Sequence, residues 1–343
     1  MKRFILPVAA AAFVAACSDA NDPSSDTSIL PDAPSEAEAP LADAALSGPS
    51  AATVRHLWAV VGQNGSLTRG SRVTGVTKLG PGQYEVTFNR SVTGCAYVAT
   101  TQNAYSQALG IFTASGHLSP NGVYVETKNQ GGGLTDGPFH LLVACGPLNT
   151  KFAVVGYSAN LVRATSGTTL TPLGAGRYRV RFPSGIRACA YLATVGDPGS
   201  QLVFSPSGVY TGSGPDANTV YIETKNPGGG LQDGVPFHLA LICPTTASAR
   251  LAAGKASGIA QRASAGTSSS RPSTGNYLVA NNLNIGACAT IATRGSVNTG
   301  VPFSPATVEI TPGASNAFGV QVRQLLFFGG ALANQAFHAA AIC

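Results

Sequence analysis

The sequence predicts an all-β protein with three tandem antiparallel β-sandwich domains, each with one core disulfide, after a disordered acidic tether. A frame of equivalent residues occurs three times, and a Cys follows Trp58, Phe152 and Leu251 after 37 residues in each copy. Apolar and polar residues alternate between Gly/Pro turns, as in the run from Tyr84 to Phe88. This period of two is typical of a half-buried strand.

The chain begins with an export signal. Lys2 and Arg3 precede an apolar run that ends at Ala16 and contains Pro7. This run is too short to span a bilayer as a helix, but it has the length of a signal core. A simple secretory signal, cleaved near Ala16, would leave Cys17 as a free thiol.

The run from Val14 to Cys17 resembles the lipobox of bacterial lipoproteins. The resemblance implies removal of residues 1–16 and acylation of Cys17, so that a lipid anchor holds the protein to a membrane. Ser18 rather than Asp follows the Cys, which in the sorting rule of Gram-negative lipoproteins implies the outer membrane. The head would then face either the periplasm or the outside.

Residues 17–52 have the composition of a tether. They contain seven Asp and Glu, no Lys or Arg, and no aromatic residue, so they cannot bury enough apolar surface to fold. From Thr53 onward the balance reverses, with 19 basic and 8 acidic side chains and a net charge of +11.

Three domains are expected, at residues 53–149, 150–247 and 248–343. The joints between them are short, which leaves two arrangements: a stiff rod, or a cluster about a pseudo-threefold axis. The oligomeric state stays open.

Two cysteines in each copy predict three disulfides between sheets in an exported protein. The pairs would be Cys95–Cys145, Cys189–Cys243 and Cys288–Cys343. Pairing across copies is the alternative. A zinc site is not expected, because no two cysteines have the close spacing typical of zinc ligands.

The copies share the patterns Gly-x-Tyr-x-Val and Phe-His followed by a closing Cys, and the first two share Cys-Ala-Tyr. These patterns resemble repeat domains of secreted bacterial proteins. That family implies no particular activity, so function has to be argued from the residues.

Three histidines recur at one position of the repeat: His140, His238 and His338. We expect each to form a hydrogen bond to a neighbouring strand or loop. Alternatively, three imidazoles gathered on a threefold axis would bind a metal or an anion. No other ligands recur beside them, so no metal and no cofactor is predicted.

Glu126 and Glu223 also recur, each followed by an Asp in a Gly-rich turn. Paired carboxylates are a feature of glycosidases. The third copy, however, has Gln324 and Asn334 at these places, so we expect Glu126 and Glu223 to be outward strand residues that pair with Lys or Arg. No catalytic set recurs, and the protein is not expected to be an enzyme.

Arginines form two groups. Arg69, Arg163 and Arg262 recur in every copy, which favours a structural role over an aromatic ring or a loop carbonyl. The second group occurs in the second copy alone: Arg177, Arg179, Arg181 and Arg187. Three of these alternate along one strand face and would repel one another unless an anion lies across them.

The second group is therefore the candidate contact for a polyanion such as lipopolysaccharide, acidic polysaccharide or extracellular DNA, with a solvated surface as the alternative. Sequence-specific binding of nucleic acid is not expected, because the group lacks interleaved aromatic residues for base stacking.

The leading hypothesis is a non-enzymatic surface lipoprotein with a role in adhesion or in binding the envelope or matrix. The alternative is a carbohydrate-binding module that uses Tyr97, Tyr191 or exposed loop aromatics as stacking platforms. An envelope hydrolase would need acid/base pairs that the sequence does not supply.

Overall fold

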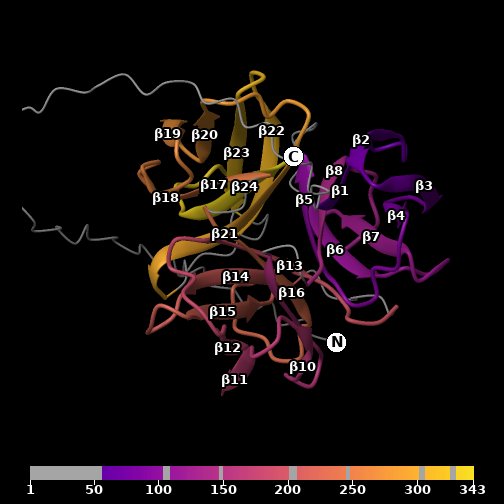
Figure 1. Cartoon of the computed structure of the whole chain (residues 1–343), viewed down its shortest axis with the longest axis horizontal. Coiled ribbons are helices and arrows are strands. Elements are labelled where there is room, and N and C mark those ends of the chain that lie inside the picture. Colours follow the sequence, from indigo (N-terminus) through magenta and orange to yellow (C-terminus); the bar gives the residue numbers. More distant parts are fainter. Residues whose placement is uncertain are drawn as a thin grey trace, which may run out of the picture. The chain divides into compact units, whose positions relative to one another are not determined.

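A computed structural model describes residues 56–102, 109–146, 150–200, 207–244, 248–300, 306–324 and 330–343. Cys17, the signal and the tether lie outside these residues. All regular elements in the described residues are β-strands, which confirms the all-β prediction (Figure 1). None of the described segments forms a helix long and apolar enough to cross a membrane.

In the described residues, each copy of the repeat contributes eight strands. Copy 1 contains β1 (Leu57–Val61), β2 (Leu67–Ser71), β3 (Val73–Gly80), β4 (Gln83–Phe88), β5 (Ala96–Gln102), β6 (Gly110–Ser115), β7 (Gly122–Lys128) and β8 (Phe139–Ala144). Copy 2 contains β9 (Lys151–Val155), β10 (Leu161–Ala164), β11 (Thr169–Gly174), β12 (Arg177–Arg181), β13 (Ala190–Val195), β14 (Gly208–Ser213), β15 (Thr219–Lys225) and β16 (Phe237–Ile242). Copy 3 contains β17 (Ala249–Gly254), β18 (Ala260–Ala263), β19 (Thr267–Ser273), β20 (Asn276–Asn281), β21 (Ala289–Thr299), β22 (Ala306–Pro312), β23 (Ala317–Gln324) and β24 (Phe337–Ile342).

The eight strands of a copy form two antiparallel groups of four. In copy 1 the inner group has the order β2-β1-β8-β5 and the outer group the order β3-β4-β7-β6. The other copies repeat this order with their own strands. Tyr84 and Val86 of the outer group pack against Phe139 and Leu141 of the inner group, so the core of the copy lies between the two.

The copies are joined by parallel contacts that close into a cycle. The outer edge strand β14 of copy 2 pairs with the inner edge strand β21 of copy 3, and β22 of copy 3 pairs in the same way with β5 of copy 1. In the described part of the chain, an isolated parallel bridge joins Thr113 of β6 in copy 1 to Gly196, which follows β13 of copy 2. Two sheets therefore run across copy boundaries, and Ala52–Cys343 forms one compact unit. Of the two arrangements left open by the sequence, the structure has the cluster.

The second face of each inner group is buried in a core shared by all three copies. Ala96, Ala190 and Ala289 occupy one repeat position in this core and are almost fully buried. Larger side chains at a second position, such as Val98 and Leu192, fill the space around them. Burial on both faces explains why β8, β16 and β24 have no exposed position.

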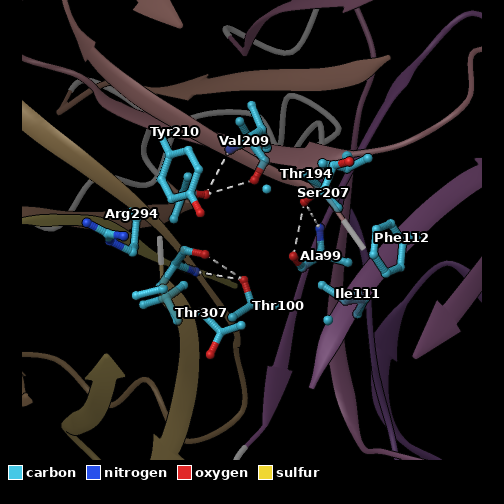
Figure 2. Close-up of a pocket in the computed structure, with 18 of the residues that line it drawn as sticks. Ala99, Thr100, Ile111, Phe112, Thr194, Ser207, Val209, Tyr210, Arg294 and Thr307 are labelled. Atoms are coloured by element: carbon cyan, nitrogen blue, oxygen red, sulfur yellow. Dashed lines mark hydrogen bonds between the residues drawn. The ribbon is translucent and has the colours of Figure 1, made fainter. Parts of the chain in front are cut away.

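Three threonines join the inner edge strands where the copies meet. Thr194 Oγ1 accepts a hydrogen bond from Ala99 N at 2.8 Å and donates one to Ala99 O at 3.0 Å. Thr293 makes the same pair of bonds to Ala193, and Thr100 makes it to Ala292. These three threonine clamps line a cavity of about 100 Å³. Figure 2 shows two of the threonines, Thr100 and Thr194, at the cavity. Each clamp satisfies backbone groups that an edge strand would otherwise leave without partners.

All three predicted disulfides are present: Cys95–Cys145, Cys189–Cys243 and Cys288–Cys343. The expectation that they bridge two sheets is wrong. Ala96 pairs with Ala144 in the β5–β8 ladder, so Cys95 and Cys145 face each other at the end of two neighbouring strands of one sheet. Three disulfides indicate an oxidising, extracytoplasmic environment.

Candidate functional site

The arginines of copy 2 form an exposed row on β12. Arg177, Arg179 and Arg181 are exposed, whereas Tyr178 and Val180 between them are buried. This is the alternation that the sequence predicts. The row therefore faces solvent along the whole strand.

Carboxylates offset only part of the charge of this row. Arg177 Nε lies 3.6 Å from Glu223 Oε1, and Arg181 forms an ion pair with Asp216. Glu223 is shared with Lys225, whose Nζ lies 2.9 Å from Oε2. Arg179 stands opposite Tyr221 in the β12–β15 ladder. Four cations thus face two carboxylates, and the face of β12 stays positive.

The basic surface continues from β12 to the junction of copies 2 and 3. Arg187 Nη2 donates to Gly214 O at 3.3 Å, in the turn that also contains Asp216, the partner of Arg181. Arg187 and Arg262 line a groove of about 590 Å³ together with polar side chains such as Asn298. Burial lowers the pKa of Arg262, and the nearby charge of Arg187 lowers it further. We call these five residues, Arg177, Arg179, Arg181, Arg187 and Arg262, the arginine track.

The other copies show that most of this track is not needed for folding. The register of β4 and β20 places Gln83, Glu85 and Thr87 of copy 1, and Asn276, Leu278 and Ala280 of copy 3, at the positions of the β12 arginines. Thr93 and Gly286 hold the position of Arg187, two residues before the first Cys. Because the same strands form without these arginines, their presence in copy 2 requires an explanation outside the fold.

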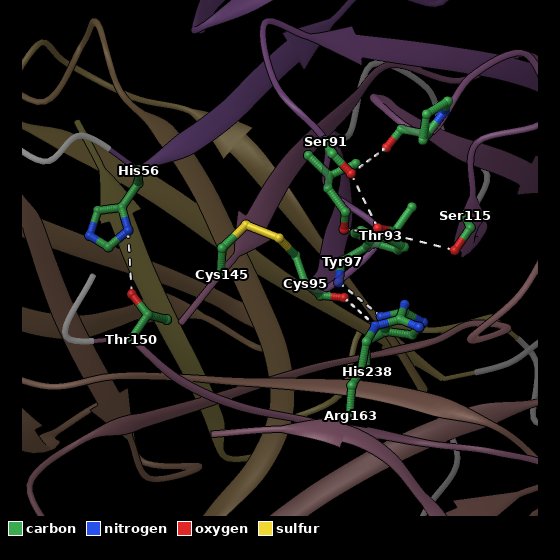
Figure 3. The surroundings of a disulfide bond; sticks show 12 residues. His56, Ser91, Thr93, Cys95, Tyr97, Ser115, Cys145, Thr150, Arg163 and His238 are labelled. Atoms are coloured by element: carbon green, nitrogen blue, oxygen red, sulfur yellow. Dashed lines mark hydrogen bonds between the residues drawn. A yellow bond between two sulfur atoms is a disulfide. The ribbon is translucent and has the colours of Figure 1, made fainter. Parts of the chain in front are cut away.

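The recurring arginines have the structural role that was predicted. Arg163 Nε donates to Cys95 O at 2.7 Å, and its guanidinium lies 5.4 Å from the centre of the Tyr97 ring (Figure 3). Arg69 Nε donates in the same way to Cys288 O, and Arg262 donates to Cys189 O through Nη1. Each of these arginines therefore ties its copy to the preceding copy of the cycle.

The recurring histidines also bond to the preceding copy. His238 Nδ1 accepts a hydrogen bond from Tyr97 N at 2.9 Å (Figure 3), and His140 Nδ1 accepts one from Thr290 N at 2.8 Å. The ring of His338 stacks on Tyr191 with centroids 4.8 Å apart. Burial lowers the pKa of each of the three imidazoles to about 3, with a smaller contribution from the neighbouring arginine. His338 Nε2 lies 3.3 Å from Ser296 O in the neighbouring strand β21. The predicted hydrogen bond to a neighbouring strand or loop is thus confirmed for all three histidines.

The alternative role of the histidines, a shared metal site, has no support in the geometry. Each imidazole faces a different copy of the repeat. Across the described ranges, no three His, Cys, Asp or Glu side chains lie close enough to hold a metal ion together.

The recurring glutamates pair with lysines, as predicted, but they are not outward-facing. Glu126 Oε2 lies 2.7 Å from Lys128 Nζ, and the side chain of Glu126 is 3% exposed. Lys128 in turn lies over the ring of Phe112, which packs into the core of copy 2, so the next copy covers this face. The alignment of the third copy was also wrong: Gln321, not Gln324, holds the position of Glu126.

The aspartates of the Gly-rich turns have a local role. Asp136 and Asp233 each accept a hydrogen bond of 2.6 Å from the turn glycine before the Tyr strand, and Asn334 does so at 2.9 Å. The carboxylates that suggested a glycosidase are therefore engaged in ion pairs and turn contacts.

The tyrosines expected as sugar-stacking platforms are buried. Tyr97 and Tyr191 are 0% exposed, because each ring lies between a histidine and an arginine of the next copy. Among the described Phe, Tyr and Trp residues, Tyr157 is the exposed one. Carbohydrate stacking on Tyr97 or Tyr191 is excluded by this burial.

No protein-family model, curated protein or solved structure matches the chain.

Proposed function

We propose that this protein is a non-enzymatic lipoprotein of the bacterial outer membrane that binds anionic polymers through the arginine track. The observation that carries this proposal is the restriction of four of the five track arginines, Arg177, Arg179, Arg181 and Arg187, to one copy of a threefold repeat. A residue required by the fold recurs, as Arg69, Arg163 and Arg262 do. Arg179 and Arg187 do not recur, and both are exposed.

Anionic polysaccharide or lipopolysaccharide fits this surface. The β12 row offers guanidinium groups at every second residue, a spacing that suits repeated carboxylates or phosphates along a chain. The groove lined by Arg187 and Arg262 extends the contact past the end of the strand. The net charge of +11 from Thr53 onward draws such polymers toward the surface.

The test is binding of the protein to immobilised lipopolysaccharide and polygalacturonate, with neutral dextran as a reference. The double variant Arg179→Gln/Arg187→Thr removes two arginines and supplies at position 187 the residue of copy 1. We expect it to weaken binding by roughly tenfold. The matched control, Lys255→Gln/Arg271→Gln, removes two exposed charges outside the track and should change affinity by less than about twofold.

Equal losses in both double variants would mean that net charge, rather than the track, attracts the polymer. An unchanged affinity in the first variant would exclude the track as the binding site. Binding should also fall between low and physiological salt, because the Debye length shortens to about 8 Å.

The membrane anchor is a separate part of the proposal. Mass spectrometry of the mature protein should find acyl chains on an N-terminal Cys17, and Cys17→Ser should release the protein from membranes. A mature chain with an unmodified Cys17 would support the simple secretory signal instead.

We further propose that residues 53–149, 150–247 and 248–343 are three β-sandwich domains that depend on one another in the closed cycle. Their separate cores support the division, and the shared core supports the dependence. Copy 2 expressed alone should expose the apolar face of its inner group and associate or unfold. A monomeric, cooperatively folded single copy would contradict this dependence.

A further inference from the structure

One of the positions at which the three junctions between copies differ lies two residues after the first Cys. Tyr97 and Tyr191 hold this position in copies 1 and 2, and Thr290 holds it in copy 3. The difference changes what fills the space between the histidine and the arginine that the next copy contributes.

In two junctions a phenol ring fills this space. The Tyr97 ring stacks on His238 with centroids 4.9 Å apart, and the Arg163 guanidinium lies 5.4 Å from the same ring. The Tyr191 ring lies 4.8 Å from the His338 ring and 4.8 Å from the Arg262 guanidinium. The repeat thus forms an imidazole–phenol–guanidinium stack twice.

The third junction has the equivalent histidine and arginine, but no aromatic side chain of the described residues lies between them. Thr290 N donates to His140 Nδ1 at 2.8 Å, as Tyr97 N donates to His238, and Arg69 Nε donates to Cys288 O at 3.1 Å. Instead of a ring there is a cavity of about 260 Å³. Its lining includes Arg69, Gln102, His140, Ile285, Thr290 and Phe318.

We propose that this cavity binds a small single-ring phenol, which takes the place that the Tyr97 and Tyr191 rings have in the other junctions. The cavity is large enough for a single ring, since an apolar protein cavity of about 150 Å³ binds benzene. Phe318, which stands where the outer sheets of the other copies have Val123 and Val220, adds an aromatic wall without closing the cavity.

The hydroxyl of the phenol has an identifiable acceptor. Tyr97 Oη donates to Val92 O at 2.9 Å, three residues before the first Cys of copy 1. Ile285 holds the same position in copy 3 and lines the cavity. Ile285 O already accepts Cys288 N, as Val92 O accepts Cys95 N while it binds the tyrosine, so its second lone pair serves the ligand.

The walls suit an aromatic ring more than a saturated one. His140 Nε2 lies 3.1 Å from Gln102 Oε1 and donates to it, because Nδ1 accepts from Thr290 N. Burial lowers the pKa of His140 to about 3, so a neutral imidazole face meets the ring at neutral pH. The Arg69 guanidinium on the other side attracts the negative face of an aromatic ring.

The experiment is calorimetric titration of the full-length protein with phenol, with cyclohexanol as a probe of similar size and benzene as a probe without the hydroxyl. We expect phenol to bind with a Kd of roughly millimolar or tighter and cyclohexanol at least about tenfold more weakly. Benzene should fall between the two, because it keeps the stack and loses the hydrogen bond to Ile285 O.

Thr290→Tyr tests the location of the site. This variant supplies the residue found at Tyr97 and Tyr191, and it should abolish phenol binding and raise the Tm. Thr74→Tyr, which adds the same side chain at an exposed position of β3, should leave phenol binding unchanged. Equal binding of phenol and cyclohexanol, or phenol binding that persists in a folded Thr290→Tyr, would overturn the proposal.

A crystal of the wild-type protein soaked with 4-bromophenol gives a result that does not depend on any variant. The anomalous bromine signal should lie in the cavity between Arg69 and His140. A bromine signal found only elsewhere, or none at saturating 4-bromophenol, would refute the site.

Discussion

The threonine clamps give the sharpest test of the closed cycle. Thr194→Val replaces a hydroxyl by a methyl group of nearly the same size. The variant removes the donor to Ala99 O and the acceptor of Ala99 N in one step. Thr194 is 3% exposed, so the new methyl group lies in the same buried surroundings as the hydroxyl.

The expected loss follows from the two backbone groups left without partners. Each buried, unsatisfied group costs about 1–3 kcal/mol, so Thr194→Val should lower the free energy of unfolding by about 2–6 kcal/mol. This loss is a large share of the free energy of unfolding of a typical protein, which is about 5–15 kcal/mol. Thr194→Ser keeps the hydroxyl and should cost only about 1 kcal/mol for the lost methyl group.

Urea unfolding at pH 7 with the disulfides intact measures these differences. The exposed control Thr171→Val should stay within about 0.5 kcal/mol of the wild type. Thr100→Val tests closure itself, because Thr100 bonds to Ala292 at the contact between the last copy and the first. A loss at Thr194 without a comparable loss at Thr100 would mean that the cycle is open, and a loss below about 1 kcal/mol at both would refute the role of the clamps.

Three further predictions concern the buried groups of the same region. The recurring histidines have a pKa of about 3 in the folded protein and 6.5 in the unfolded chain, so the unfolded chain binds more protons between these pH values. Stability should therefore fall as the pH drops from 6.5, by about 1.4 kcal/mol per pH unit for each histidine. A Tm that stays level from pH 7 to pH 4 would contradict this prediction. Burial raises the pKa of Glu309 from 4.5 to about 7, so between these pH values the folded chain binds a proton that the unfolded chain has lost. The stability of the protein therefore falls as the pH rises from 4.5 to 7. Glu309→Gln, which cannot ionise, should raise the Tm at pH 8 more than at pH 5. An equal shift of the Tm at both pH values would assign the Glu309→Gln effect to packing. Removal of one disulfide by Cys189→Ala/Cys243→Ala opens a loop of 54 residues and should cost about 4 kcal/mol on the chain-entropy model, measured as a shift in the urea midpoint; an unchanged midpoint would contradict that cost.

Local patterns in the sequence were enough to predict the strands and the disulfides. The alternation from Tyr84 to Phe88 and the constant distance to each first Cys reflect contacts within one copy. The joining of edge strands across copies could not be predicted, because nothing local in β14 or β21 specifies its parallel partner. The burial of Glu126 was missed for the same reason, since the covering side chains come from the next copy.

For the candidate sites, the sequence identified the arginines of copy 2 but not their continuation to Arg262, which lies in the next copy. The threonine clamps had a signal that could have been used: a Thr recurs five residues after each first Cys. The cavity at Thr290 also had a signal in the sequence, namely a small residue where the other two copies have a Tyr. Its meaning depends on the imidazole and guanidinium that another copy places on either side of it.

The three copies act as internal controls for one another, and the junctions show how far they have diverged. Where outer and inner edge strands meet, one junction packs Phe112 against Val195, and the equivalent residues of the next junction are Tyr210 and Arg294, with the guanidinium 5.1 Å from the ring centre. The third junction pairs Glu309 with Thr101. Each junction therefore differs from the others on both strands: the first has an apolar pair, the second a cation on an aromatic ring, and the third a glutamate whose strand position pairs with that of Thr101. Such paired differences leave the cycle intact. The four track arginines of copy 2 and the replacement of tyrosine by Thr290, in contrast, each occur in one copy without a compensating change in its partner. We expect a change that occurs in one copy alone, with no matching change in the facing copy, to reflect selection for binding rather than for the fold.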